Sequence, residues 1–134
     1  MTEHITPAQL KSRKGSSDAH SALVSACMAY LKLRRTPACR MYTGARLYTE
    51  KDGSATRRTN PDMKGMPDII ACLPNGWWAS IDGCWLNKGR TVWIECKTGK
   101  AVQAPHQKAR AAEWQKAGAL VLIVRSVADL EAAL

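Results

Sequence analysis

The chain lacks any stretch of about 18 apolar residues, which is the length that a membrane-spanning helix requires. Its N-terminus, from Met1 to Lys14, is polar and has no apolar run, so we do not expect a secretory signal. We also find no internal repeats. These absences predict a cytoplasmic protein with no membrane partner.

The cysteines form no CxxC pair, and their number is odd. Both features argue against a disulfide framework and against a four-cysteine zinc site. We therefore expect buried or free thiols in a reducing compartment. The residues concerned are Cys27, Cys39, Cys72, Cys84 and Cys96.

A length of 134 residues and a hydrophobic content of 46% predict one globular domain. The net charge of +9 favours a polyanionic partner, either nucleic acid or a membrane surface, although charge retained for solubility is an alternative. The charge is uneven. Up to Lys64 there are 12 Lys and Arg against 5 Asp and Glu, which gives +7, and the rest of the chain has 8 against 6, which gives +2.

Hydrophobic periodicity and turn-forming residues divide the chain into a flexible basic tail, residues 1–15, and a folded domain, residues 16–134. Residues 50–65 are polar and rich in turn formers, which predicts a loop. The order of the expected elements predicts an α/β fold with a mixed central sheet between helices. We expect helices at 20–35, 103–117 and 127–134, and strands at 39–42, 45–49, 67–73, 77–81, 91–97 and 119–125.

Three residues in two of these strands carry the candidate chemistry. Asp68 opens an apolar strand, and Glu95 and Lys97 lie two residues apart, so they project from one face of theirs. Two carboxylates on neighbouring strands form an oxygen-rich site suited to Mg²⁺ or Mn²⁺. Lys97 would orient or deprotonate a water at such a site. The alternative is a structural Glu95–Lys97 pair with Asp68 as a cap.

Gln107 is the polar member of a helical stripe that continues through Ala111, Trp114 and Gly118. The stripe is expected to face the sheet, so the Gln107 side chain would bond the site lysine or a metal-bound water. The alternative is an exposed glutamine at the start of the helix.

Three segments together resemble one nuclease family: GMPDII (65–70), WIECKTGKAVQAPHQ (93–107) and KAGALVLIVRS (116–126). They are similar to the VRR-NUC (virus-type replication-repair nuclease) family within the PD-(D/E)XK superfamily, over about residues 17–130. The resemblance implies a restriction-endonuclease-like core and assigns residues 16–134 to a VRR-NUC domain. It also implies a metal-dependent phosphodiesterase that leaves 5′-phosphate and 3′-hydroxyl ends. Metal contacts would come from Asp68, Glu95 and the backbone carbonyl of Cys96, with Lys97 beside the attacking water.

Stand-alone members of this family in phages and bacteria resemble Holliday-junction resolvases, which work as symmetric dimers. The resemblance therefore implies a homodimeric, structure-selective DNA endonuclease of replication, repair or recombination, acting on branched DNA in a bacterial or phage-infected cell. Two alternatives stay open. One is a general nicking or nonspecific DNase, and the other is a catalytically weak DNA-binding module of the same fold.

The chain departs from the family pattern in two places. His20 stands where the first helix usually has a metal-binding glutamate, and as a ligand it would shift the preference toward Mn²⁺. A capped or packed histidine is the alternative. The interval between Asp68 and Glu95 is long, and residues 77–90 resemble an inserted hairpin rich in Trp and basic residues. That hairpin would stack on unpaired bases, meet a second subunit, or pack its Trp side chains on the core.

Basic residues outside this hairpin are expected to bind phosphates, because no segment resembles an element that reads the major groove. The polar loop of residues 50–64 is expected either to become ordered on DNA or to remain solvated. The predicted phosphate-binding residues are Arg40, Arg46, Arg57, Arg58, Lys64 and Lys100.

Overall fold

The computed structural model describes residues 2–41, 46–58, 60–74, 80–81, 84–85 and 89–134. For residues 2–3, 5, 7–17, 46–47, 58, 80–81 and 84–85 only the backbone is described. The elements are, in order, β1 (Thr2–Ile5), α1 (Pro7–Leu33), β2 (Ala38–Arg40), β3 (Arg46–Thr49), β4 (Ala55–Arg58), η1 (Pro61–Met63), β5 (Ile69–Cys72), β6 (Ser80–Ile81), β7 (Cys84–Trp85), β8 (Thr91–Cys96), α2 (Pro105–Lys116), β9 (Leu120–Val124) and α3 (Val127–Ala133).

The central sheet has four strands in the order β2-β5-β8-β9. β5 pairs with β2 and β8 in the antiparallel sense, whereas β8 and β9 are parallel. Parallel neighbours need a long crossover, and α2 provides it. β8 lies between two partners and is buried from Val92 to Cys96, which explains why its sequence is apolar on both faces. The expected α/β fold with a mixed sheet is confirmed.

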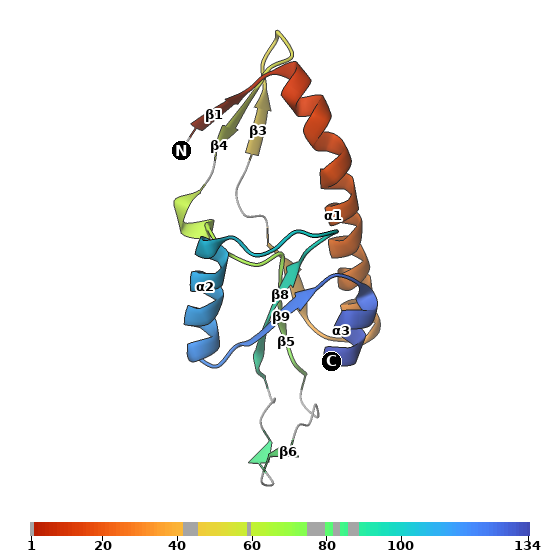
Figure 1. Ribbon diagram of the computed structural model, residues 1–134. Helices are drawn as coiled ribbons and strands as arrows, with labels where there is room; N and C mark the ends of the chain where they lie inside the picture. The colour runs from red at the N-terminus through yellow and green to blue at the C-terminus, as the bar shows by residue number, and fades with distance from the viewer. Residues whose placement is uncertain (1, 42–45, 59, 75–79, 82–83, 86–88) are drawn as a thin grey trace.

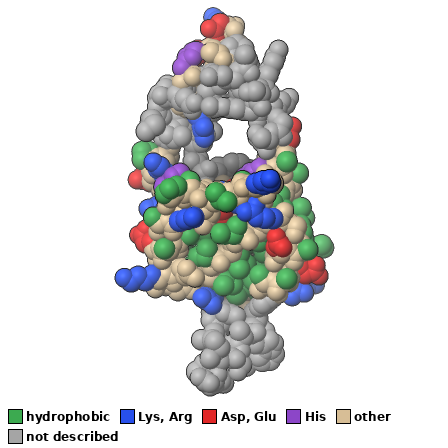
Figure 2. All heavy atoms as spheres, in the orientation of Figure 1, with side chains coloured by type: hydrophobic (Ala, Val, Ile, Leu, Met, Phe, Trp, Pro, Cys, Tyr) green, Lys and Arg blue, Asp and Glu red, His purple; other side chains and the backbone are tan. Residues whose placement is uncertain are grey.

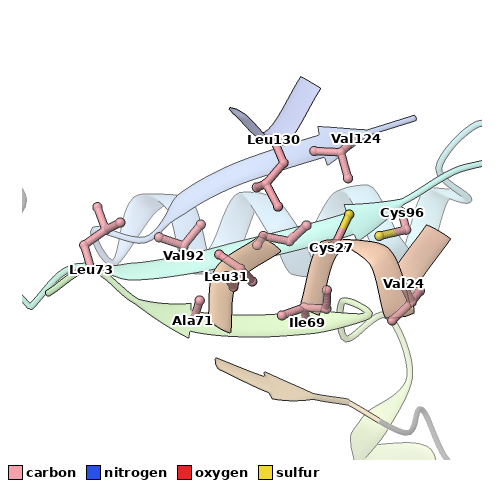
Figure 3. Packing of buried hydrophobic residues seen from close by; sticks show 11 residues of the cluster. Val24, Cys27, Leu31, Ile69, Ala71, Leu73, Val92, Cys96, Val124 and Leu130 are labelled. Carbon is pink, nitrogen blue, oxygen red and sulfur yellow. The ribbon is translucent and has the colours of Figure 1, made fainter. Parts of the chain in front are cut away.

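Alternate residues of β8 face two different core layers. Val92, Ile94 and Cys96 join a cluster with Val24 and Leu31 of α1 and with residues of β5, β9 and α3. Figure 3 shows the α1 side chains lying over β5 and β8, with Leu130 of α3 close to β9. Val92, Ile94 and Cys96 therefore share the face of β8 that packs against α1.

The opposite face of the sheet packs against α2. Trp93 is completely buried there together with Ala111, and Trp114 of α2 packs against them. The rings of Trp93 and Trp114 have centroids 5.0 Å apart and are tilted by 58°, an arrangement that aromatic pairs favour. Helix α2 ends at Lys116, one residue before the expected end, and Gly118 follows its C-cap with a φ of +110°, a conformation that favours glycine.

A second sheet, of three strands in the order β1-β4-β3, lies beyond the end of the central sheet and beside the start of α1 (Figure 1). A two-stranded pair, β6-β7, forms at the opposite end of the molecule. Among the residues that the structure describes, no helix has the length and apolar character needed to cross a bilayer.

The N-terminal segment differs from the expectation. In place of a flexible tail, residues 2–5 form β1 and pair with β4, and α1 begins at Pro7 instead of near residue 20. Proline is favoured at the first position of a helix because the missing N–H has no partner there in any case. The pairing of β1 depends on a strand about fifty residues away, which local periodicity does not reveal.

The expected loop at 50–65 is also corrected, because it contains β4 and the short helix η1. The strands expected at 39–42 and 45–49 are neighbours in the sequence, on either side of a turn that Thr43-Gly44 predicts. They instead belong to different sheets, since β2 pairs with β5 and β3 pairs with β4. Partners from elsewhere in the chain outweigh the local turn signal. The turn itself, Thr43-Gly44, lies outside the described residues.

The expected hairpin at 77–90 is described in part. β6 and β7 pair in the antiparallel sense, Ser80 with Trp85 and Ile81 with Cys84. Trp77, Trp78 and Lys88 lie outside the described residues. Arg90 at the base of the hairpin donates a hydrogen bond from Nε to the Gly118 carbonyl at 2.9 Å. This hydrogen bond links the residue before β8 to the segment that precedes β9.

Gly65 provides a test of how the segment before Asp68 is held. It has a φ of +81°, and a Cβ there would lie 2.8 Å from the His106 carbonyl oxygen of α2. Gly65→Ala should reduce the free energy of unfolding by roughly 3 kcal/mol, because backbone strain and a clash combine. Urea denaturation measures the loss. Gly89→Ala is the control, since Gly89 has a φ of +66° with open space around it, and only about 1 kcal/mol is expected. Equal losses in both variants would show that α2 does not press on Gly65.

Candidate active site

The pairing of β5 with β8 brings Asp68 beside the end of β8. Ile69 pairs with Ile94, so the residue before Ile69 lies next to the residues that follow Ile94. The backbone N–H of Cys96 donates to Asp68 Oδ2 at 2.8 Å. This bond fixes one oxygen of the aspartate and leaves the carboxylate at the end of the sheet. The expected juxtaposition of the two strands is therefore present.

Glu95, Lys97 and Gln107 form one hydrogen-bonded network. Lys97 Nζ lies 3.3 Å from Glu95 Oε1 and donates to Gln107 Oε1 at 2.9 Å. Gln107 Nε2 donates in turn to Glu95 Oε1 at 3.0 Å. The Gln107 oxygen also accepts the N–H of Ala104, which precedes α2, so the same side chain caps the helix. The expectation that Gln107 bonds the site lysine is confirmed.

Glu95 is 3% exposed, and burial strongly disfavours its charged form. This desolvation, followed by the negative charge of Asp68, raises the pKa of Glu95 to about 7, although Lys97 opposes the rise. The second carboxylate oxygen, Oε2, is buried and has no hydrogen-bond partner among the residues that the structure describes. A buried acceptor of this kind is costly unless another group satisfies it.

His20 contacts the other oxygen of Asp68. Its Nε2 lies 3.2 Å from Asp68 Oδ1, and its side chain is 39% exposed. The next residue, Ser21, accepts a hydrogen bond from Arg40 at 3.3 Å. Helix α1 therefore brings a histidine and, through Ser21, an arginine of β2 to the same end of the sheet. His20 pairs with the carboxylate in this arrangement.

The donor set fits a divalent cation that binds through few protein groups. Asp68 and Glu95 offer carboxylate oxygens side by side, and the orphaned Oε2 of Glu95 lacks the partner that a cation would provide. In the described part of the chain, no group of three or more His, Cys, Asp or Glu side chains could hold a metal. Mg²⁺ needs only one or two carboxylates when water and substrate phosphate complete its coordination. The site therefore matches a cation held partly by water and substrate, and does not match one enclosed entirely by protein ligands.

The predicted phosphate-binding residues fall into separate groups. Lys64 and Lys100 are exposed on segments next to the site, and Arg40 is half-buried beside α1. The other three, Arg46, Arg57 and Arg58, belong to the second sheet. Figure 2 shows Lys, Arg and His side chains gathered at the end of the main body nearest that sheet.

Arg125 is a residue to which the sequence analysis assigned no role. Its guanidinium donates to the carbonyls of Gly99 at 3.0 Å and Ala101 at 2.8 Å. Both belong to the loop at 98–104, which joins Lys97 to the start of α2. The backbone N–H of Arg125 donates to Asp129 in the first turn of α3. Arg125 thus fastens the loop of the site to the end of β9. A charged residue directly after an apolar strand was the only signal.

Comparison of the chain with protein-family models, with curated proteins and with solved structures found no match. The resemblance of its three motifs to the VRR-NUC family therefore remains a prediction. Function must be inferred from the geometry of the residues that the fold brings together.

The raised pKa of Glu95 predicts a pH-dependent stability in the metal-free protein. Between its ordinary pKa of 4.5 and about 7, the native state binds a proton that the unfolded state has released. This contribution is present below pH 4.5 and is lost as the pH rises through 7, and it amounts to on the order of 3 kcal/mol. Glu95→Gln removes this titration. Urea denaturation in EDTA at pH 5 and pH 8 should therefore show that the wild type loses stability relative to the variant. If the wild type and Glu95→Gln lose the same free energy of unfolding between pH 5 and pH 8, the raised pKa of Glu95 is contradicted.

The role of Arg125 can be tested without any activity. Arg125→Gln should raise amide exchange in residues 98–104 by about tenfold, the equivalent of about 1.4 kcal/mol for its lost hydrogen bonds. Hydrogen-exchange mass spectrometry measures the change. Arg90→Gln is the matched control, because it removes a guanidinium–carbonyl bond at the other end of the sheet. An equal rise at 98–104 in both variants would mean general loosening.

Proposed function

We propose that the protein is a divalent-metal-dependent DNA endonuclease with a PD-(D/E)XK core, selective for branched DNA. One observation carries the proposal. Asp68 is bonded to the end of the adjacent strand, β8, and Glu95 of that strand contacts a lysine that a glutamine holds in place. Structural ion pairs rarely leave a buried carboxylate oxygen without a partner, whereas a cation site requires one.

Each residue has a distinct task in this proposal. Asp68 and Glu95 would hold Mg²⁺ or Mn²⁺ through one oxygen each, with the carbonyl of Cys96 as a further ligand. Such a cation would polarise the phosphodiester and lower the pKa of a coordinated water. Lys97 lies next to Glu95, where its ammonium group can orient the attacking water and neutralise developing charge. Gln107 keeps the lysine aligned.

DNA as the substrate is supported by charge. The net charge is +9, and Lys64 and Lys100 are exposed next to the site. Basic surface of this kind attracts the phosphate backbone irrespective of sequence. Selectivity for branched DNA and a homodimer with two matched sites are part of the proposal. They rest on the motif resemblance, because two symmetric nicks need two sites related by a two-fold axis.

A second candidate is a DNA-binding module of the same fold with little turnover. The contact between His20 and Asp68 favours it, because a histidine occupies one oxygen that a metal would use. Cleavage assays separate the two candidates.

Asp68→Asn and Lys97→Ala should each reduce DNA cleavage at least about a hundredfold while DNA binding stays near normal, because neither residue is one of the predicted phosphate-binding side chains. The substrates are labelled four-way junction, flap, duplex and single-stranded DNA, with Mg²⁺ or Mn²⁺. Controls are Asp62→Asn and Lys116→Ala, which change exposed residues away from the network and should cut like the wild type.

The same panel decides between the candidates. Paired symmetric nicks in the junction support a resolvase, and equal cutting of junction and duplex indicates a nonspecific DNase. A wild-type protein that binds these DNAs and cuts none of them with either metal is the binding module.

A further inference from the structure

The register of the second sheet places chemically related residues on one of its faces. Residues opposite one another in antiparallel strands share a face, and the faces alternate along each strand. Arg46 of β3 is opposite Arg58 of β4, and Thr2 of β1 is opposite Arg58 on the other side. Two residues further along, Tyr48, Thr56 and His4 are aligned in the same way. We call these six positions the basic-aromatic face.

Two of the side chains described on the basic-aromatic face are exposed to solvent. Tyr48 is 45% exposed and His4 is exposed. Ala55, which the register places on the other face, is completely buried. None of the six positions is acidic. The nearby acid Asp52 lies in the turn after β3, where its carboxylate accepts hydrogen bonds from Ser54.

Two arginines directly opposite one another across strands reduce stability in water, because like charges repel at that spacing. An anion held at both positions reverses the effect. A tyrosine on the same face adds an aromatic surface on which a nucleotide base can stack. Arginine pairs combined with an exposed aromatic ring are typical of surfaces that follow a sugar-phosphate backbone.

The position of the sheet suits such a role. It lies beyond the end of the central sheet at which β8 ends, and that end carries Asp68, Glu95 and Lys97 (Figure 1). DNA seated at the site would extend past this end of the sheet. A basic surface there would contact phosphates on the DNA outside the scissile step.

We propose that the basic-aromatic face binds the sugar-phosphate backbone of DNA that extends from the scissile bond. This rests on the proposed endonuclease function. The register also distinguishes residues that composition treats alike, because Arg57 lies on the opposite face of the sheet, where Glu3 is its partner across β1 and β4. Arg58 and Arg46 therefore contact DNA, and Arg57 does not.

Arg58→Gln and Arg57→Gln form a matched pair, since they remove the same charge from neighbouring residues of one strand. Binding is measured by fluorescence anisotropy over a range of salt concentrations, on a labelled four-way junction with long arms. Arg58→Gln should weaken binding about fivefold to tenfold and lower the salt slope by about 1, as expected for one lost phosphate contact. Arg57→Gln should change affinity by less than about twofold.

Shortening the junction arms gives a second readout. If the face binds flanking DNA, the difference between the two variants disappears on arms too short to reach the sheet. Urea denaturation checks that both variants are folded. If Arg58→Gln does not fold, Arg46→Gln carries the same expectation, because Arg46 holds the directly opposite position on β3.

The outcomes separate the two proposals. Equal affinities for Arg58→Gln and Arg57→Gln on long arms, with a wild type that binds and cuts, overturn only the role of the basic-aromatic face. A wild type that fails to bind any of the DNAs overturns the endonuclease proposal and this one together. A loss specific to Arg58→Gln that requires long arms supports the role of the face.

Discussion

The burial of Glu95 is the constraint on which the rest of the structure depends. A carboxylate with 3% exposure in the most buried strand of the sheet loses nearly all of its hydration. Lys97 and Gln107 contact only one of its two oxygens, Oε1. The other oxygen, Oε2, has no hydrogen-bond partner in the described part of the chain. Half-satisfied polar groups in a core reduce stability, and the unsatisfied oxygen is the one to which the proposed function assigns a cation.

The crossover from β8 through α2 to β9 builds this environment. It places Gln107 in the first turn of α2, above the end of β8, and returns the chain so that Arg125 can hold the connecting loop. The packed rings of Trp93 and Trp114 hold α2 against the central sheet. The site therefore rests on a packed helix and two paired strands, and such rigid support keeps reacting groups aligned.

Local patterns were sufficient for most of the central domain. The two-residue spacing of Glu95 and Lys97 predicted that they share a face of β8, where their side chains are in contact. Gly118 and the stripe through Gln107 predicted the end and the orientation of α2. The N-terminal region was different. β1 and β4 exist because they pair with each other and with β3, and neither segment has a strong strand pattern by itself. For β2 the strand itself was predicted, at 39–42, but its partner β5 was not.

The sequence by itself determined the candidate acids, the lysine and the glutamine, because their types and spacings are unusual inside apolar segments. It also determined the basic character of the N-terminal half. Only the tertiary structure decided that Asp68 meets Cys96, that His20 reaches Asp68, and that Arg125 holds the loop beside the site. It alone separated Arg58 from Arg57. The physical reason is that contacts between distant segments depend on strand register and helix packing, which no local window of residues contains.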